Sequence, residues 1–223
     1  MRAALMECTP PDVAALVTEH RCFADACTLA QEDLAAFLAK DPAQQDSATA
    51  ILHGSTSFRA VLHYRLAHSL IETADSDPRA PGELKTYASL VASRGKLLSG
   101  ADIHPRCKIG RRFVLDHGWG SVIGETSLIG DDCYLLGGVT LGATGIADNP
   151  AGKRHPTIGD RVQIGAFARV FGDIRVGSDV FIGSHCSITH DIAPHSIVTL
   201  RSETQIVRSR NGASLSEPSH NVI

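Results

Sequence analysis

Aliphatic residues recur at every sixth position through the second half of the chain. The unbroken run comprises Ile158, Ile164, Val170, Val176, Ile182 and Ile188. A small or apolar residue lies four positions after the first five of these, at Val162, Ala168, Ile174, Val180 and Cys186. A period of six fits neither an α-helix nor a flat amphipathic strand. The pattern predicts a β-solenoid, in which each short strand contributes one aliphatic side chain to a central core before the chain turns a corner.

The same period extends upstream but slips twice. Its upstream blocks are Ile103, Ile109 and Leu115, followed by Ile123, Ile129, Leu135 and Leu141. Leu115 and Ile123 are eight positions apart, so two additional residues enter within LDHGWG, residues 115–120. The second slip is residues 142–157, whose Gly, Pro, Asp and Asn content predicts a loop. Insertions in repeat proteins often gather on the binding face, although neutral insertions of surface residues would produce the same slips.

The first 99 residues lack this period and carry helical patterns instead. Helices are predicted within 25–42, 57–72 and 84–98, with a loop at 73–83. The residues after about 200 are polar and aperiodic, which is typical of a flexible tail. We therefore expect an α+β protein with a helical N-terminal domain at 1–99, a solenoid domain at 100–200 and a flexible tail at 201–223.

Composition and charge narrow the functional classes. Apolar residues make up 43% of the chain and charged residues 20%, as in soluble globular proteins. A net charge of −3 argues against a partner held by overall positive charge, such as duplex nucleic acid. No apolar run reaches the roughly 18 residues of a membrane span, and the N-terminal segment lacks the apolar stretch of a secretory signal. Six scattered cysteines without a CxxC pair favour a reducing, cytoplasmic location.

Six motifs in the solenoid half follow one another in an informative order. They are DIHP at 102–105, LDHGWG at 115–120, VIGETSLIG at 122–130, GVTLGATG at 138–145, KRHPTIG at 153–159 and IGAFARVFGDIRVG at 164–177. Their order closely resembles the serine O-acetyltransferases, a family of hexapeptide-repeat acyltransferases, and the resemblance extends from about Asp41 to Val198. It implies a left-handed parallel β-helix. It also implies an enzyme that moves the acetyl group of acetyl-CoA to the hydroxyl of L-serine, giving O-acetyl-L-serine for cysteine biosynthesis.

The resemblance also implies which residue acts as general base. His117 would remove the hydroxyl proton of serine, and Asp102 would hold its imidazole. A serine hydroxyl is a poor nucleophile, and an imidazole with its usual pKa of about 6.5 is suited to removing that proton near neutral pH. A carboxylate on the other ring nitrogen fixes the tautomer. The slip at 115–120 then has a reason, since it lets His117 face outward into a cleft between solenoids.

The remaining site residues are inferred from the same resemblance. Asp41 and Asp116 match binders of the ammonium group of the amino acid, and Arg154 matches a binder of its carboxylate. His155 is expected beside the reacting centre, with Glu125 steadying it. For acetyl-CoA, contacts are expected from Gly142 and Ala168. Arg169 and Arg175 are candidates for the CoA phosphates because of their charge and their neighbourhood, and not because of the resemblance.

A zinc site fits the sequence less well. His185, His190 and His195 are spaced as His-x4-His twice, which resembles the ligand pairs of a hexapeptide-fold carbonic anhydrase. The third ligand of that arrangement lies about two coils earlier, where this chain has Asn149 or Arg154. We therefore expect no metal.

A covalent cysteine intermediate is also unsupported. Cys107, Cys133 and Cys186 occupy core positions of the period, so we expect them to behave as small apolar residues. Direct transfer of the acetyl group is the preferred interpretation.

The acceptor and the assembly stay open at this point. Homoserine or another hydroxy amino acid is an alternative acceptor, because one methylene is worth only about 1 to 3 kcal/mol in a pocket. A non-catalytic hexapeptide scaffold is a third interpretation. The resemblance implies a homotrimer or a dimer of trimers, while residues 198–208 replace the segment that closes the solenoid near CoA in the family. The C-terminal Ile223 matches the family tail that enters O-acetylserine sulfhydrylase, which makes that enzyme an expected partner.

Overall fold

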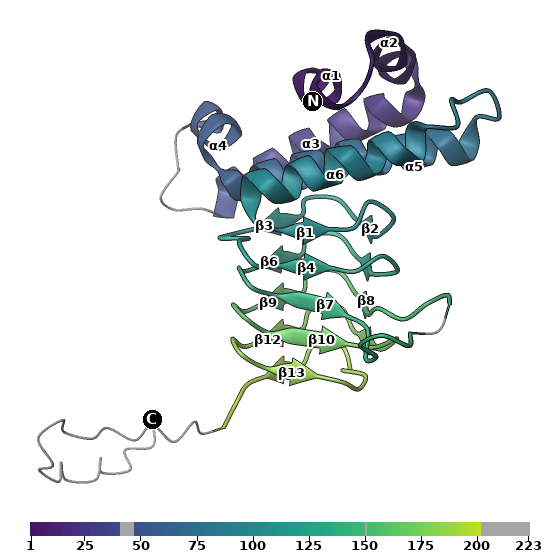
Figure 1. Cartoon of the computed structure of the whole chain (residues 1–223). Coiled ribbons are helices and arrows are strands. Elements are labelled where there is room, and N and C mark those ends of the chain that lie inside the picture. The colour runs from purple at the N-terminus through teal and green to yellow at the C-terminus, as the bar shows by residue number, and fades with distance from the viewer. Residues whose placement is uncertain (41–46, 150, 202–223) are drawn as a thin grey trace, which may run out of the picture.

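The structure, a computed structural model, describes residues 1–40, 47–149 and 151–201, and in these ranges helices come first and short strands follow (Figure 1). The helices are α1 (Arg2–Cys8), α2 (Pro11–Glu19), α3 (Arg21–Lys40), α4 (Ala48–Gly54), α5 (Thr56–Ser76) and α6 (Leu84–Ser99). The strands of the first two coils are β1 (Asp102–Ile103), β2 (Lys108–Ile109), β3 (Val114–Leu115), β4 (Val122–Ile123), β5 (Leu128–Ile129) and β6 (Tyr134–Leu135). The later strands are β7 (Thr140–Gly142), β8 (Thr157–Ile158), β9 (Gln163–Ile164), β10 (Arg169–Phe171), β11 (Arg175–Val176), β12 (Phe181–Ile182), β13 (Ser187–Ile188) and β14 (Ile197–Val198).

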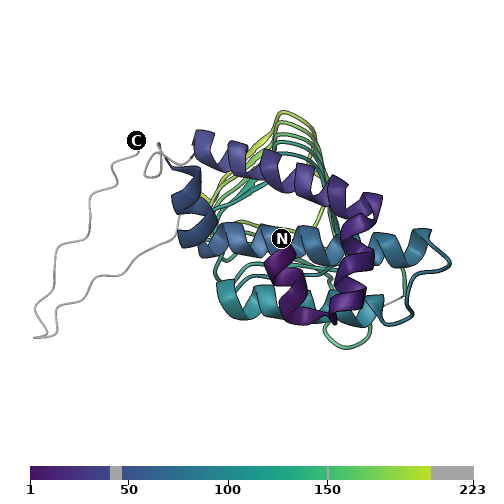
Figure 2. The ribbon, with the colours of Figure 1, turned by 90° about the horizontal axis from the view of Figure 1, so that it is seen from above.

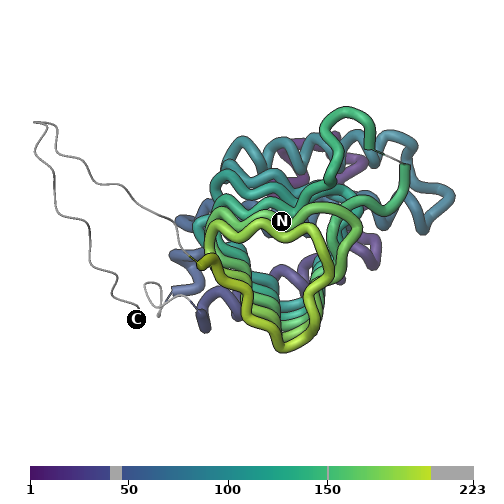
Figure 3. The backbone as a smooth tube through the Cα atoms, turned by 90° about the horizontal axis from the view of Figure 1, so that it is seen from below, coloured from purple at the N-terminus to yellow at the C-terminus, as the bar shows by residue number. Residues whose placement is uncertain are grey.

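The strands form three parallel sheets that wrap into a triangular solenoid. Sheet A has the order β1-β4-β7-β10-β13, sheet B the order β11-β8-β5-β2, and sheet C the order β14-β12-β9-β6-β3. Coils contribute a strand to each sheet in turn, so strands three apart in sequence are neighbours up to β13. In the last coil an isolated bridge from Val176 to Ile192 replaces the strand of sheet B, and β14 pairs with β12. Seen along the axis, the coils superimpose as a triangle (Figure 3). The predicted solenoid is confirmed.

The strand register places both predicted slips. Val122 pairs with Thr140, eighteen positions later, which is the length of a regular coil. Asp102 pairs with Val122, twenty positions later, so the first coil holds two extra residues. Thr140 pairs with Arg169, twenty-nine positions later, so the third coil holds eleven more. That excess forms the loop between β7 and β8, which projects from the solenoid (Figures 1 and 3).

The solenoid interior contains the periodic aliphatic residues. All members of the predicted run from Ile158 to Ile188 are buried in one core cluster. Cys107, Cys133 and Cys186 lie in the same cluster. Burial raises the pKa of the Cys107 thiol to about 12 and that of Cys133 to about 11. Neither thiol is therefore a nucleophile at neutral pH.

Helix α5 closes the top of the solenoid. It lies between α3 and α6, and the three helices run across the first coil (Figure 2). Ala60, Val61 and Tyr64 of this helix belong to the solenoid core cluster. The Tyr64 hydroxyl donates to the carbonyl of Cys107 at 2.9 Å and accepts the Ile109 N–H at 3.1 Å. Helix α5 therefore contributes to the solenoid core, while the other buried apolar residues of the helices form clusters of their own.

The ends of α5 and α6 follow from local chemistry. Ser55 caps α5 by accepting the Phe58 N–H at 3.1 Å. Gly100 ends α6 with φ 74°, a left-handed conformation that glycine adopts without strain. The loop predicted at 73–83 begins later, at Asp77, because the buried Thr73 satisfies its hydroxyl on the Ser69 carbonyl and lets the helix continue. Across the described ranges, no helix combines the length and apolar character that a membrane crossing requires.

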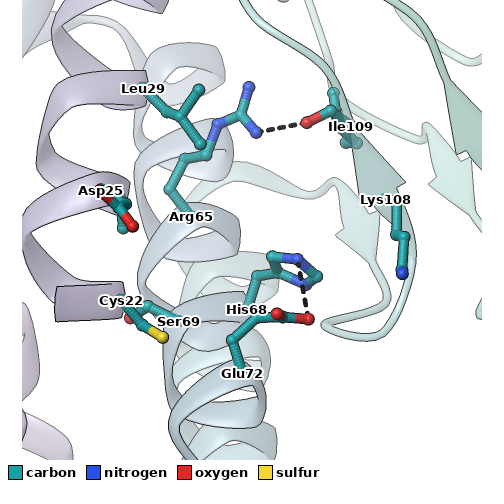
Figure 4. Close-up of a pocket in the computed structure, with 10 residues that line it drawn as sticks. Cys22, Asp25, Leu29, Arg65, His68, Ser69, Glu72, Lys108 and Ile109 are labelled. Carbon is teal, nitrogen blue, oxygen red and sulfur yellow. Dashed lines mark hydrogen bonds and ion pairs between the residues drawn. The ribbon is translucent and has the colours of Figure 1, made fainter. Parts of the chain in front are cut away.

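A pocket of about 280 Å³ lies where α3 and α5 meet β2 (Figure 4). Arg65 and His68 contribute its polar wall, and Lys108 lies on the strand side. His68 bonds the Pro105 carbonyl through Nδ1 at 2.8 Å and lies 3.7 Å from the carboxylate of Glu72. The polar groups of this pocket therefore help to dock the helices onto the first coil.

Candidate active site

The backbone of His117 departs from the regular corner geometry. Two corner columns of the solenoid repeat a positive φ in successive coils. One column holds Arg112, Asp132, Arg161, Asp179 and His195, and the other holds Gly100, Gly120, Gly138, Phe167 and His185. His117 has φ 49° and belongs to neither column. A non-glycine residue in this region is uncommon and costs backbone energy, which is typical of functional positions.

The two extra residues of the first coil turn His117 outward. Its side chain is 85% exposed, at the corner that leads from sheet C into sheet A. The adjoining Gly118 N–H donates to the buried Ser57 hydroxyl of α5 at 2.9 Å. The carbonyl of His117 lies so close to Gly137 in the coil below that no side chain fits there. The two-residue insertion is therefore contacted by Ser57 of α5 on one side and by Gly137 of the next coil on the other. Ser57 has no motif that would have signalled this role.

Asp116 is the carboxylate found next to His117. Its Oδ1 lies 3.8 Å from Nε2 of His117, and its Oδ2 accepts the Tyr134 hydroxyl at 2.7 Å. Asp102, expected to hold the imidazole, instead forms an ion pair with Lys96 at 2.6 Å. Among the described residues, Asp102 makes no hydrogen bond or ion pair with His117. Asp41 lies outside the described residues.

The second part of the site lies where the long loop returns to the solenoid. Arg154 forms an ion pair with Glu125, with NH2 2.5 Å from Oε2. This hydrogen bond lowers the pKa of Glu125. Glu125, expected to steady His155, forms its ion pair with Arg154, and the Thr126 hydroxyl lies 2.9 Å from Nδ1 of the His155 ring. His155 is 8% exposed, and burial, followed by the charges of Arg154 and Lys153, lowers its pKa.

A cavity of about 340 Å³ opens beside this part of the site. Arg106, Lys108 and Lys153 bring positive charge to it, and Glu125 and Thr126 complete the wall nearest to Arg154. Sequence reasoning missed Thr126 and Lys153. The position of Thr126 next to Glu125 in the GET motif was a usable signal, and so was the position of Lys153 next to Arg154 in the KRHPTIG motif.

A single chain does not bring the two parts of the site together. His117 and Asp116 precede β4 at one end of sheet A. Arg154 and His155 follow β7 and its loop at the other end. Strands of sheet A therefore separate the predicted base from the predicted carboxylate binder.

The four residues expected to contact acetyl-CoA differ in their environments. Arg169 on β10 and Arg175 on β11 are exposed, on adjacent sheets A and B. Gly142 lies against the Phe171 ring in the next coil, where a Cβ atom would approach to 2.8 Å. Ala168 offers no side chain to the surface. Its side chain is fully buried in the core, and its N–H and carbonyl are both used in backbone hydrogen bonds.

The three histidines considered for zinc lie on different corners of their coil. His185 precedes β13, His190 follows it, and His195 lies before β14. His185 stacks on Phe167 with ring centroids 5.4 Å apart, and His195 lies 3.7 Å from Asp179. Within the described ranges, no three His, Cys, Asp or Glu side chains converge as a metal site would need.

Comparisons with known proteins agree with this architecture. The family described as bacterial transferase hexapeptide (six repeats) matches residues 155–190. The serine acetyltransferase of Helicobacter pylori is 39% identical over 173 residues, covering 78% of this chain and 94% of that protein. The serine acetyltransferase isoform 3 of Entamoeba histolytica, solved in complex with cysteine, superposes with a TM-score of 0.73 at 32% identity, covering 94% of this chain and 71% of that one. The soybean serine acetyltransferase complexed with serine gives a TM-score of 0.72 at 32% identity over 83% of this chain and 70% of that one.

These matches agree with the predicted left-handed parallel β-helix preceded by helices. The likeness covers both the helical part and the solenoid, and the identity to named relatives exceeds 35% over most of the chain. The chain belongs to the serine acetyltransferase family.

Proposed function

We propose that the protein transfers the acetyl group of acetyl-CoA to the hydroxyl of L-serine, giving O-acetyl-L-serine for cysteine biosynthesis. The observation that carries the proposal is the exposed imidazole of His117. The backbone of this residue has a positive φ, although it belongs to neither of the two corner columns in which a positive φ repeats. The related soybean and Entamoeba structures, which contain serine and cysteine, support an amino-acid substrate of this size.

The transfer needs one base and no covalent intermediate. His117 takes the proton of the serine hydroxyl as the oxygen forms a bond to the thioester carbonyl carbon. The tetrahedral intermediate then collapses, the carbon–sulfur bond breaks, and the CoA thiolate takes the proton from His117. The raised thiol pKa values of Cys107 and Cys133 argue against a cysteine nucleophile.

The acceptor amino acid has complementary charges available on the two parts of the site. Arg154 offers a planar guanidinium for its carboxylate, with Glu125 holding that guanidinium in place. Asp116 offers a carboxylate for its ammonium group, held by the Tyr134 hydroxyl. Asp41 is proposed for the same role, and Asp102 as the residue that orients His117 when substrate is present.

Acetyl-CoA is proposed as the second substrate, bound without a metal. Its phosphates need cations, and the guanidinium groups of Arg169 and Arg175 have no side-chain partner among the described residues. Gly142 makes room for the Phe171 ring of the paired strand β10, and its backbone is proposed as a contact for the pantetheine arm.

A homotrimer, or a dimer of trimers, completes the proposed site. Because sheet A separates His117 from Arg154 within one chain, a neighbouring copy is needed to bring a second Arg154 and His155 opposite His117. Exposed apolar side chains support such an interface. Trp119 is 77% exposed beside His117, and Phe167 is 51% exposed at the same corner two coils below. O-acetylserine sulfhydrylase stays a proposed partner through Ile223, which lies outside the described residues, and a cytoplasmic location stays a prediction.

An acceptor panel tests the proposed function. Purified protein is mixed with acetyl-CoA and L-serine, L-homoserine or no acceptor, and free thiol release is followed. Fast release with L-serine alone is expected. Faster thiol release with L-homoserine would identify L-homoserine as the acceptor instead. If neither hydroxy amino acid gives thiol release, the scaffold interpretation is favoured. The His117→Ala variant serves as the matched inactive control.

A further inference from the structure

The side chain of Thr126 joins the strand coil to the returning loop through one hydroxyl. Its Oγ1 accepts the backbone N–H of Arg154 at 3.0 Å and that of His155 at 3.1 Å. The same atom lies 2.9 Å from Nδ1 of His155. A threonine hydroxyl has two lone pairs and one proton. Both lone pairs are used by the two N–H groups, so the proton is the group that meets Nδ1.

The backbone of Thr126 gives an independent indication of the same tautomer. Its N–H points at Nδ1 of His155 at 3.2 Å. An N–H group can only donate, so Nδ1 must present its lone pair. Two donors thus converge on Nδ1, and the ring proton of neutral His155 belongs on Nε2.

The opposite edge of the ring is left free for a ligand. Among the described residues none hydrogen-bonds Nε2, and the fully buried polar side-chain atoms without a partner are Ser121 Oγ and Ser127 Oγ alone. Within the described ranges, Nε2 therefore has no protein hydrogen-bond partner. The ring packs on Gly124 so closely that a Cβ atom there would overlap it. Glycine at this position leaves room for the imidazole.

Lys153 anchors the peptide that carries His155. Its ammonium group donates to the carbonyl of Thr126 at 2.8 Å and to the carbonyl of His155. The loop end is thus fixed to the coil by Lys153 on one side and by the Thr126 hydroxyl on the other. Both anchors act on the backbone, so they hold the position of the ring as well as its tautomer.

We propose that Thr126 is a positioning residue that holds His155 in the tautomer with its proton on Nε2, so that this imidazole serves the transfer as a hydrogen-bond donor and not as a second base. The inference rests on the proposed function. Its acceptor is a substrate oxygen that carries negative charge, either the carboxylate of the amino acid or the oxygen of the tetrahedral intermediate. The two histidines of the site then have different roles. His117 removes the proton of the serine hydroxyl, and His155 keeps its Nε2 proton and donates a hydrogen bond with it.

The charges around His155 agree with a neutral donor. Burial is the largest cause that lowers its pKa, and the cations Arg154 and Lys153 lower it further. Glu125 acts in the opposite direction, and His104 lowers the pKa slightly. A neutral imidazole is a donor at Nε2 and can keep accepting at Nδ1.

Nitrogen NMR of the full-length protein tests the tautomer directly. In histidine-labelled protein near neutral pH, with His155→Gln used for assignment, the His155 signals should show Nε2 protonated and Nδ1 unprotonated. A proton on Nδ1, or on both nitrogens, would overturn the proposal. This measurement needs no turnover, so it separates the inference from the acceptor assignment, which the panel tests.

Variants of Thr126 test its role in the reaction. Thr126→Val removes the hydroxyl at nearly equal volume and should lower kcat/KM for serine about 10- to 100-fold, the range expected for losing a hydrogen bond that positions a polar group. Thr126→Ser keeps the hydroxyl and should restore most of the activity and the wild-type His155 signals. Thr157→Val is the control, because the Thr157 hydroxyl bonds no described residue.

The division between KM and kcat identifies the acceptor oxygen. A rise in the serine KM alone in Thr126→Val indicates the carboxylate, and a fall in kcat indicates the intermediate. If Thr126→Val folds normally, as judged by circular dichroism, and keeps both its turnover and its His155 signals, Thr126 has no positioning role. If Thr126→Ser behaves like Thr126→Val, the hydroxyl is not what matters, and the proposal fails.

Discussion

Arg65 of α5 and Asp33 of α3 form a two-point ion pair where the helices meet the solenoid. The Arg65 Nε lies 2.8 Å from Oδ2 of Asp33 and its NH2 lies 3.1 Å from Oδ1, with side chains 1% and 0% exposed. Arg65 also donates to the carbonyls of Ile109 and Gly110 (Figure 4 shows the first), and Asp33 accepts the Phe113 N–H. The first coil has no coil above it to satisfy the backbone groups of Ile109, Gly110 and Phe113. The Arg65–Asp33 pair supplies hydrogen-bond partners to these groups instead.

Breaking this pair should strongly destabilise the fold. Asp33→Asn or Arg65→Met leaves one buried charge without its partner, which costs about 3–5 kcal/mol. Urea unfolding monitored by circular dichroism should show that loss in both variants. Arg161→Ala, which breaks the more exposed Arg161–Asp179 pair, is the control with little expected loss. A loss below about 1 kcal/mol in Asp33→Asn would contradict the prediction.

His117→Ala should lower kcat with L-serine by at least about 10²-fold while the fold is retained. The residue lies at a slip of the solenoid and its exposed side chain contributes nothing to the core. Steady-state thiol release and thermal unfolding are measured on the same samples. His195→Ala offers a matched control, since it is also an exposed histidine with positive φ but lies at another corner. Near-normal turnover in folded His117→Ala would remove the residue from the mechanism.

Arg154→Ala should raise the serine KM about tenfold or more with little effect on the acetyl-CoA KM. A hydrogen-bonded guanidinium is worth about 1.5–3 kcal/mol to a carboxylate. Arg154→Lys should recover only part of this, because an ammonium group lacks the planar two-point geometry. Initial rates are measured with each substrate varied in turn. A raised acetyl-CoA KM with an unchanged serine KM would instead place Arg154 at the cofactor.

Mixing two impaired variants should restore part of the activity at low L-serine concentration if the site is shared between copies. In mixed trimers of His117→Ala and Arg154→Ala, an interface with His117 from one copy and Arg154 from the next arises about one quarter of the time. Co-expressed and co-purified variants should therefore recover up to about a quarter of wild-type turnover. Each variant alone is the control. No recovery in proven mixed trimers would show that one chain holds the complete site.

Folding stability should fall as pH drops through about 6.5. Burial is the first cause that lowers the pKa values of His63, His104 and His155. Their imidazoles therefore take up protons in the unfolded chain at a higher pH than in the folded protein. The unfolded state binds more protons in that range, so the free energy of unfolding decreases with decreasing pH. Urea midpoints between about pH 7.5 and 5.5 measure this, His63→Gln should reduce the slope, and a level profile would refute it.

Periodicity alone determined the solenoid. Side chains six apart occupy equivalent positions on successive sides of the triangular coil, so the aliphatic run from Ile158 to Ile188 identified the core without any contact information. The same arithmetic located both slips, and the burial of Cys107 and Cys133 followed from their place in the period. Helix ends were predictable where a local signal exists, as at Gly100.

Only the tertiary structure decided which corner residues meet. Glu125 bonds Arg154, and Thr126 bonds His155, and each pair is twenty-nine positions apart in the sequence. The length of the intervening loop does not predict that these side chains meet. Asp102 forms an ion pair with Lys96. Arg65 is buried against the first coil, where it bonds the carbonyl of Ile109, more than forty positions away in the sequence. Such contacts depend on how coils stack and how helices dock on them. Local hydrophobic patterns report which side of an element faces the core, and they carry no information about the partners that distant segments bring to a polar side chain.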